Sequence, residues 1–304
     1  MNFTLASKTL AAFEHFVKID QGAAWRQHLG RVMPHLDDAY RGKDEGFRTH
    51  LGASLIGREC GRELWYGFHW SSKSIHEGRM LRLFNRGHME EGRFIALLLT
   101  IGCEVYQQDA NGKQFRISEF GGHFGGSGDG VAIGIPDFAP GVASLLEFKT
   151  HNDKSFAKLV KEGVRAAKFE HWVQMQVYMR KMGLTHAVYF AINKNDDHIH
   201  AEIVYLDSAT ADRFIERAGT IIRLHQAPAM INKSPGWYGC NFCDFKPICK
   251  LGKPVERNCR TCAYSEPSVE DGSWRCTNPI DRCVLSKADQ LAGCSHYELS
   301  PSYK

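Results

Sequence analysis

Residues 145–156 read LLEFKTHNDKSF and place Glu147 and Lys149 two positions apart in an apolar segment. The pattern predicts a β-strand, in which side chains at positions i and i+2 point to the same face, about 7 Å apart. A carboxylate and an ammonium held side by side suit metal-assisted hydrolysis of a phosphodiester. The carboxylate would bind a hard divalent cation, and the lysine would polarise the attacking water or the scissile phosphate.

A second carboxylate lies upstream, in the stretch GGHFGGSGDGVAIG of residues 121–134. Asp129 precedes Glu147 by 18 residues, which leaves room for a turn and a strand between them. Five of the eight residues 121–128 are glycines. Glycine lets a backbone approach a ligand such as DNA closely, but it also weakens a strand. Asp137 therefore stays open as the alternative carboxylate.

The order Asp129, then Glu147-x-Lys149, resembles the active-site signature of the PD-(D/E)XK nuclease superfamily. The segment HWVQMQVYM follows at residues 171–179, with Gln174 and Tyr178 four apart on one face of an expected helix. This Gln-x-x-x-Tyr after Glu-x-Lys resembles the RecB-type nucleases, where the Gln and Tyr lie near the metal site and the DNA backbone. An amphipathic core helix with incidental polar residues is the alternative.

The segment RGHMEEG, residues 86–92, lies in a helical pattern upstream of both carboxylates. His88 and Glu91 are three apart and face the same way. RecB-like nucleases and the CRISPR spacer-acquisition nucleases carry such a histidine before the Asp. The resemblance implies that His88 binds the metal and that Glu91 supports it, with Glu90 as the alternative to Glu91. An imidazole joined to carboxylates suits manganese.

The resemblance thus implies a full set of site residues for one or two Mg²⁺ or Mn²⁺ ions. The implied metal ligands are the side chains of His88, Asp129 and Glu147 and the carbonyl of Phe148. Lys149 would orient the attacking water, and Gln174 and Tyr178 would position the DNA strand.

Basic residues follow the expected catalytic strand, although the net charge of +4 and the pI of about 8.5 say little about nucleic acid. Lys154 and Ser155 come just past the strand, and Lys158 and Arg165 have helical spacing. We expect these four residues to contact DNA phosphates. A solvated helix face predicts the same spacing.

The chain has ten cysteines and begins without the apolar core of a signal peptide. Its sequence contains no apolar run long enough to cross a membrane. We therefore expect a reducing compartment, the cytoplasm of a bacterial host cell, in which clustered cysteines bind metal rather than form disulfides. Cys103 has the pattern of a buried core residue.

Cys240, Cys243 and Cys249 form C-x2-C-x5-C and need a fourth ligand, for which Cys60 is the candidate. One early cysteine followed by this motif resembles the iron–sulphur nucleases, namely the AddB subunit and the CRISPR spacer-acquisition nucleases. The resemblance implies a structural 4Fe–4S cluster. Zinc is the alternative occupant.

A second cysteine group fills the last 46 residues. A C-x2-C pair with two later cysteines predicts a structural zinc site, because the segment is too short to bury a core. The expected ligands are Cys259, Cys262, Cys276 and Cys294. Cys283 and His296 stay open as alternatives.

The expected elements are helices over 5–100, strands over 103–149, a helix within 153–182, a strand pair, and a helix over 208–226. This order fits the αβββαβ core of restriction-endonuclease-like α/β folds. We expect an N-terminal helical region at 1–100, a nuclease core at 101–250 closed by the iron–sulphur motif, and a zinc-binding tail at 251–304.

The motifs together predict a metal-dependent DNA exonuclease of RecB-like, phage-type character, acting in DNA recombination, repair or replication. DNA is the expected partner, and a helicase, recombinase or single-strand-binding protein is a further candidate. One alternative is a non-catalytic DNA-binding or scaffold protein that retains the nuclease fold. The other is a DNA-trimming nuclease that works with an integrase or helicase. The sequence does not predict the oligomeric state.

Overall fold

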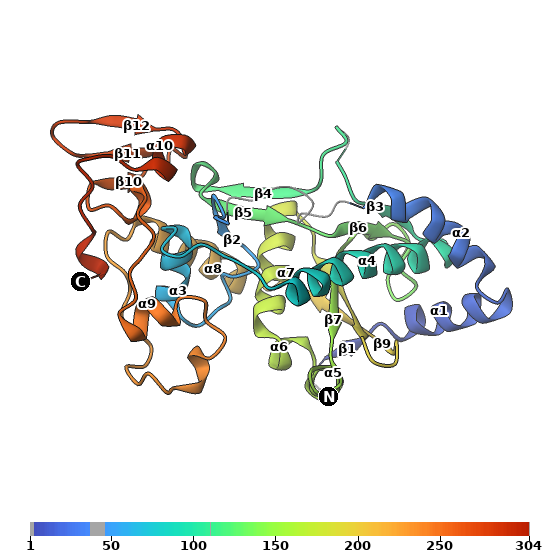
Figure 1. Ribbon diagram of the computed structural model, residues 1–304. Coiled ribbons are helices and arrows are strands. Elements are labelled where there is room, and N and C mark those ends of the chain that lie inside the picture. Colours follow the sequence, from blue (N-terminus) through green and yellow to red (C-terminus); the bar gives the residue numbers. More distant parts are fainter. Residues whose placement is uncertain (1–2, 37–45, 110, 304) are drawn as a thin grey trace. The chain divides into compact units, whose positions relative to one another are not determined.

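The computed structural model describes residues 3–36, 46–109 and 111–303 (Figure 1). The chain forms two compact units, each built from separate segments. The first unit takes Met1–Lys43, His76–Ile117 and Ser127–Asp212, and the second takes Asp44–Ile75, Ser118–Gly126 and Arg213–Lys304. The three domain ranges expected from the sequence remain a proposal about how the chain is organised.

A six-stranded mixed sheet forms the centre of the first unit, in the order β1-β9-β8-β7-β6-β3. Its strands are β1 (Thr4–Leu5), β3 (Glu104–Tyr106), β6 (Gly130–Ile133), β7 (Ser144–His151), β8 (His186–Asn193) and β9 (Ile199–Tyr205). Strands β7 and β8 run parallel, whereas the other neighbours are antiparallel. Because β7 has a partner on each side, the strand that carries the Glu-x-Lys motif is central and rigid.

Helices cover both faces of this sheet. They are α1 (Ser7–Ile19), α2 (Ala23–Val32), α4 (Gly78–Thr100), α5 (Asp153–Glu162), α6 (Val164–Ala167) and α7 (Phe169–Met182). Successive side chains of β7 alternate between the two faces. Phe148 faces α4, where its ring stacks on that of Phe94 with centroids 5.2 Å apart. Glu147 faces α7, where it contacts Gln174. The motif therefore points its functional side chains away from the main core.

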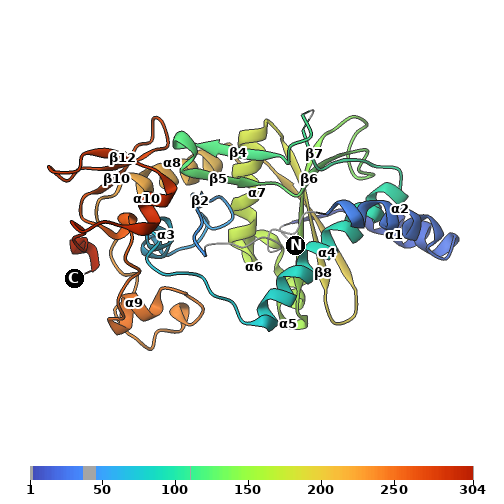
Figure 2. The ribbon, with the colours of Figure 1, turned by 45° about the horizontal axis from the view of Figure 1, so that its top comes forward.

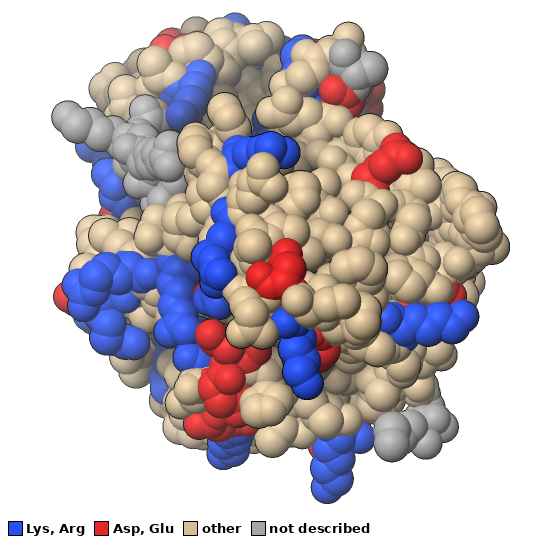
Figure 3. Space-filling model, turned by 90° about the vertical axis from the view of Figure 1, so that its right-hand side faces the viewer, with Lys and Arg blue, Asp and Glu red and all other residues tan. Residues whose placement is uncertain are grey.

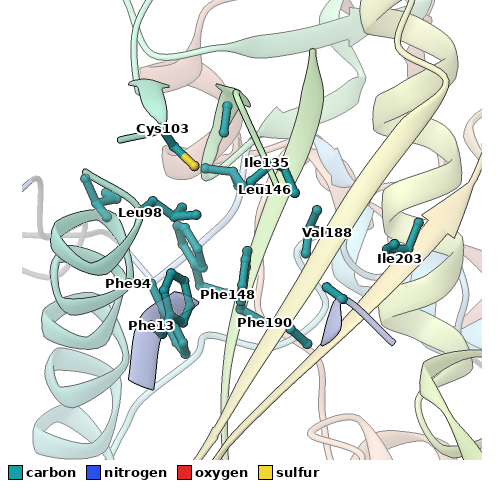
Figure 4. Close-up of a cluster of buried hydrophobic side chains, with 14 of the residues drawn as sticks. Phe13, Phe94, Leu98, Cys103, Ile135, Leu146, Phe148, Val188, Phe190 and Ile203 are labelled. Atoms are coloured by element: carbon teal, nitrogen blue, oxygen red, sulfur yellow. The ribbon is translucent and has the colours of Figure 1, made fainter. Parts of the chain in front are cut away.

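The core of the first unit lies between α1, α4 and the sheet (Figure 4). Phe13, Phe94, Phe148 and Phe190 meet there as neighbouring rings. Cys103 is buried in the same cluster, and its thiol donates to the carbonyl of Gly134, which confirms it as a core residue. Burial of these aromatic side chains stabilises the strand that holds the site.

A second, three-stranded sheet has the order β2-β5-β4, with β2 (Leu51–Gly52), β4 (Arg116–Glu119) and β5 (Phe124–Ser127). Residues 123–134, expected as one strand, thus form two strands, β5 and β6, which belong to different sheets. The expected strand around residues 116–119 also lies outside the six-stranded sheet. The expected core sheet was wrong at these two places.

The second unit contains short helices and a small antiparallel sheet. In Figure 2 these elements lie in the part of the molecule that holds the C-terminus. Its elements are α3 (Gly61–Phe68), α9 (Lys246–Leu251), β10 (Ser265–Pro267), β11 (Trp274–Cys276), β12 (Cys283–Leu285) and α10 (Lys287–Ala292). Helix α8 (Ser208–Arg223) runs from the first unit into the second. Short 3-10 turns occur at Met33–His35, Phe120–Gly122, Tyr238–Cys240, Cys259–Thr261 and Pro301–Tyr303.

The fold is therefore a mixed α/β arrangement with N-terminal helices, a central mixed sheet and a small C-terminal sheet. None of the helices within the described ranges is long and apolar enough to span a bilayer.

Candidate active site

Glu147 lies in the middle of β7 and is completely buried. Its Oε1 accepts a hydrogen bond from the ammonium of Lys149, on the same face of the strand. Its Oε2 accepts a hydrogen bond of 3.0 Å from Gln174 Nε2 on α7. The structure therefore brings together the Glu-x-Lys motif and the glutamine of the Gln-x-x-x-Tyr motif.

Asp129 lies between β5 and β6, beside the same segment of β7. Its Oδ2 accepts a 2.8 Å hydrogen bond from the backbone N–H of Phe148. The N–H and C=O of a strand residue point toward the same edge. The carbonyl of Phe148 therefore points toward the edge at which the carboxylate of Asp129 lies. The last β6–β7 pair is Gly130 with Leu146, so Phe148 lies just past the end of that pairing.

The glycines around Asp129 let the backbone pass close to other parts of the protein. Gly130 has φ +154°, and a Cβ there would lie 2.9 Å from the carbonyl oxygen of Tyr106. A Cβ at Gly128 would reach within 4.0 Å of the ring of Tyr178. The backbone angle and the contact with Tyr106 thus account for Gly130 without DNA. The contact at Gly128 is an ordinary one, and it places the buried Tyr178 next to the residue that precedes Asp129.

Asp137, the alternative carboxylate, is hydrogen-bonded to the first turn of α1. It accepts hydrogen bonds from the backbone N–H groups of Lys8 and Thr9 at 3.0 and 2.8 Å, and from the hydroxyl of Thr9. These bonds satisfy donors that a helix N-terminus leaves unpaired. The geometry favours Asp129 over Asp137 as the partner of Glu147.

The charges in this site are strongly coupled. Burial raises the pKa of Glu147 to about 7, although Lys149 beside it favours the carboxylate form. The negative charge of Asp129 adds to the rise. Burial lowers the pKa of Lys149, but the charges of Glu147 and Asp129, with that of Glu91, outweigh it and raise the pKa. A bound divalent cation would relieve both the burial penalty and the repulsion between the carboxylates.

A cleft of about 510 Å³ opens next to Lys149. His88 and Glu91, both on α4, line it, and so does the buried Glu90. Glu90 is also bonded to Arg93, with 3.1 Å between Oε1 and Nη1. The negative charge of Glu91 acts on Lys149, which favours Glu91 as the supporting acid. The expected His88 and Glu91 thus line the same cleft as Lys149.

The rest of this cleft carries nitrogen donors that the sequence analysis did not assign. Beside Lys149, Thr150 and the expected Ser155, these are His151, Asn152, Lys168, His171 and Lys194. His151 follows Lys149 by two positions, so a Glu-x-Lys-x-His alternation was present in the sequence as a signal. Lys168 and Lys194 had no such signal, because loop geometry brings them to the cleft.

Tyr189 connects two of these histidines. Its hydroxyl lies 2.9 Å from Nε2 of His151 and 2.9 Å from Nδ1 of His171. Burial lowers the pKa of His151 to about 4, and the positive charge of Lys168 lowers it further. Burial also lowers the pKa of His171. Both rings are therefore neutral near pH 7 and act as hydrogen-bonding groups rather than as cations.

Of the four residues expected to contact DNA, Ser155 lines the cleft. Lys158 forms an ion pair with Glu162 at 3.7 Å, and Arg165 lies over the ring of Trp172 at 4.6 Å. Lys154 is exposed on α5. Lys154, Lys158 and Arg165 are not part of the cleft wall. Figure 3 shows Lys and Arg side chains in several separate groups on one face, with Asp and Glu beside some of them.

The metal ligands do not form a ready coordination sphere. Among the residues that the structure describes, no three His, Cys, Asp or Glu side chains are arranged to hold a metal ion. The donor chemistry at Asp129 and Glu147 nevertheless fits a hard dication, since two carboxylates and a carbonyl offer oxygen ligands. The assignment of His88 to this ligand set remains a proposal.

The cysteines expected for an iron–sulphur cluster lie within electrostatic reach of one another in the second unit. Burial raises the pKa of Cys243 to about 12, and the charges of Glu63, Cys60 and Cys240 raise it further. Burial likewise raises the pKa of Cys249, and Cys60 and Cys240 add to that rise. The four thiols thus gather from positions 180 residues apart in sequence, although they are not arranged as metal ligands.

Comparison with known proteins gives distant structural similarity. No family model and no curated protein matches the sequence. The alkaline exonuclease LHK-Exo from Laribacter hongkongensis, in complex with dAMP, aligns with a TM-score of 0.42 and 18% identity, over 57% of this chain and 85% of that one. A second LHK-Exo structure gives 0.41 and 16% over the same shares. SSO0001 gives 0.38 and 15%, over 77% of this chain and 97% of that one. Similarity at this level establishes neither a common fold nor a common activity.

Proposed function

We propose that this chain is a metal-dependent DNA nuclease that acts as an exonuclease. The observation that supports it best is the arrangement around Glu147. Lys149 occupies one carboxylate oxygen, Gln174 occupies the other, and Asp129 lies close enough to raise the pKa of Glu147. Two acids, an amine and an amide lie together in one buried site. Removing such charges from water costs folding free energy, and groups of this kind cluster at functional sites, which favours phosphodiester hydrolysis over a purely structural role.

The residues have separable roles in this proposal. Asp129, Glu147 and the carbonyl of Phe148 would hold one or two Mg²⁺ or Mn²⁺ ions, with His88 as a further ligand. Bound there, the metal would lower the pKa of a water and neutralise phosphate charge. Lys149 orients the water, Gln174 fixes the rotamer of Glu147, and Tyr178 lies beside Gly128, the residue that precedes Asp129. Glu91 supports the charge of Lys149 from the other wall of the cleft.

The direct test is DNA degradation by the purified full chain. Linear duplex, linear single-stranded and covalently closed circular DNA are incubated with Mg²⁺ or Mn²⁺, and with a chelator as control. The proposal expects metal-dependent release of nucleotides from linear DNA and an intact closed circle. Lys149→Ala should lower the rate of release by orders of magnitude, whereas Lys158→Ala, on an exposed lysine outside the cleft, should not.

Cleavage of the closed circle would show that the chain is an endonuclease rather than an exonuclease. A chain that binds DNA but releases no nucleotides with either metal would instead support the non-catalytic DNA-binding or scaffold function. Release that depends on an added helicase or integrase would support the trimming function. A role in phage or bacterial recombination, repair or replication rests on the motif resemblance and has no structural support of its own.

We propose further that Cys60, Cys240, Cys243 and Cys249 hold a 4Fe–4S cluster with a structural role. The thiols interact electrostatically although they are brought together from distant parts of the sequence. Four thiolates suit such a cluster. Anaerobic purification followed by a visible spectrum and iron analysis tests this. About four irons per chain, lost in Cys243→Ser, are expected. A colourless protein with zinc in this site would reject the cluster.

A further inference from the structure

The C-terminal segment from Asn258 to Ser300 has almost no apolar core. Its buried hydrophobic side chains are those of Cys259 and Trp274. The other buried side chains of the segment are polar, namely Asn258, Arg260, Thr261, Ser268, Asn278, Gln290 and Ser300. A segment of this size with so little apolar burial needs another stabilising element to hold its three-stranded sheet together.

Backbone pairing brings the ends of this segment to one place. Strand β11 pairs with β10 and β12, so that Cys276 lies opposite Ser265 on one side and Cys283 on the other. An isolated β-bridge pairs Cys262 with Leu299, so residues near the C-terminus lie beside the C-x2-C turn of Cys259 and Cys262. Cysteines from the start, the middle and the end of the segment are thus drawn together by the fold itself.

Four thiols surround one small internal space. A cavity of about 20 Å³ is lined by Cys259, Cys262, Cys276 and Cys294, together with Tyr264, Ser265, Asn278, Leu285, His296 and Tyr297. That volume is close to the space that a single water molecule or ion needs. Of the four thiols, Cys259 is buried, Cys262 and Cys276 are partly buried, and Cys294 is exposed.

The thiols also disfavour one another's ionisation. Burial raises the pKa of Cys259 to about 11, and the charges of Cys294, Cys262 and Cys276 raise it further. Burial raises the pKa of Cys276 as well. Thiolates gathered in one small space repel each other unless a cation neutralises them, and zinc binding ionises its cysteine ligands.

We infer that the C-terminal segment binds one structural zinc ion through Cys259, Cys262, Cys276 and Cys294. Among the described residues, these four side chains do not form a metal-binding group. The inference therefore rests on the cavity that they share and on the path of the backbone. This site is separate from the nuclease residues, and its failure would leave the proposed activity untouched.

The two alternative ligands are placed differently. Cys283 lies opposite Cys276 across the sheet, but it does not line the cavity. His296 does line the cavity, but its Nδ1 bonds to the carboxylate of Asp281 on the exposed surface. That hydrogen bond leaves Nε2 available for a metal, so His296 stays the alternative to one of the four thiols.

Metal analysis of variants tests the ligand set. The wild-type chain, purified under reducing conditions from zinc-supplemented cells, should retain roughly one zinc at this site after dialysis. Cys262→Ser should lose it. Two matched controls should keep it: Cys283→Ser, which changes the cysteine opposite Cys276, and Cys243→Ser, which changes the other cysteine group. Retention of zinc in Cys262→Ser, or its loss in Cys283→Ser, would overturn the assignment.

A measurement on the wild-type protein covers the case in which Cys262→Ser fails to fold. Zinc-edge X-ray absorption should show four sulphur neighbours at about 2.3 Å. Three sulphurs and one nitrogen would overturn the four-thiol set in favour of His296. A zinc-free wild type, with disulfide-linked peptides from this segment under non-reducing mass spectrometry, would overturn the zinc site altogether.

Discussion

Gln174 Nε2 donates a 3.0 Å hydrogen bond to Glu147 Oε2 and so joins α7 to the middle of β7. Lys149 occupies the other oxygen of the same carboxylate. The side chain of Glu147 is thus fixed from two directions in a buried site. An active site requires such positioning, because a small displacement of a catalytic group lowers the reaction rate.

Replacement of Gln174 should therefore affect both stability and activity. Gln174→Leu keeps the volume but leaves a buried carboxylate oxygen without its donor, at a cost of about 1–3 kcal/mol in the free energy of unfolding. Nuclease activity should fall as well, because Glu147 loses its fixed orientation. Chemical unfolding and nucleotide release measure the two effects separately.

Gln176 is the matched control, since it is equally buried two positions along α7. It bonds to the carbonyl of Tyr205 at 3.1 Å and to the N–H of Asp207 at 2.6 Å, away from the site. Gln176→Leu should destabilise the chain without a specific loss of activity per folded molecule. Equal losses of activity in both variants would refute the positioning role of Gln174.

Lys149→Ala should lower the rate of nucleotide release by roughly 100- to 10,000-fold, because the water or phosphate loses its positive partner. Binding of Mn²⁺ should persist, since removal of the ammonium frees one oxygen of Glu147. Calorimetric titration with Mn²⁺ and single-turnover assays distinguish these effects. If Mn²⁺ binding disappears along with the rate, Lys149 acts on the metal site rather than on the reaction.

Much of this site was accessible from the sequence. The alternation around Glu147 and Lys149 fits the observed strand β7, and the spacing of Gln174 and Tyr178 fits helix α7. Both elements are rich in apolar residues and are buried over most of their length. The glycine-rich stretch before Asp129 lacks side chains to show a period, and its division between two sheets was therefore missed.

The residues on the cleft wall were harder to predict. Helical spacing shows that Lys158 and Arg165 share a face, but it does not show whether that face meets the cleft or solvent. The ion pair with Glu162 and the ring of Trp172 occupy these two side chains instead. Lys194 lies after β8, and only the parallel pairing of β7 with β8 brings it beside the Glu-x-Lys motif.

His88→Ala should change the preference between metals. An imidazole ligand favours Mn²⁺ over Mg²⁺, which prefers oxygen ligands. Activity supported by Mn²⁺ should therefore fall more than activity supported by Mg²⁺. His198→Ala, which alters an exposed histidine after β8, serves as the control. If the ratio of the two activities is unchanged in His88→Ala, the histidine is not a ligand.

Stability should fall in acid because of His69. Burial lowers the pKa of His69 to about 3, from an ordinary value of 6.5. Between these values the unfolded chain binds the proton and the folded chain does not, so the free energy of unfolding decreases as the pH falls. The contribution lost between pH 6.5 and 5 is up to about 2 kcal/mol. Urea unfolding of His69→Phe should show a shallower pH dependence than wild type in this range, and an unchanged slope would contradict the assignment.

Lys168 and Lys194 should contribute to DNA affinity, because both line the cleft beside the expected metal site. Each Lys→Ala change removes one cation that would contact a phosphate, so affinity should fall for all sequences and the slope of log K against log salt should decrease by about 1. Lys158→Ala, at a lysine already paired with Glu162 on an exposed helix, should leave that slope nearly unchanged. Binding is measured by fluorescence anisotropy on a short DNA duplex at several salt concentrations, with Ca²⁺ in place of the catalytic metal to prevent cleavage. A larger effect from Lys158→Ala than from Lys194→Ala would place the DNA along α5 instead of in the cleft.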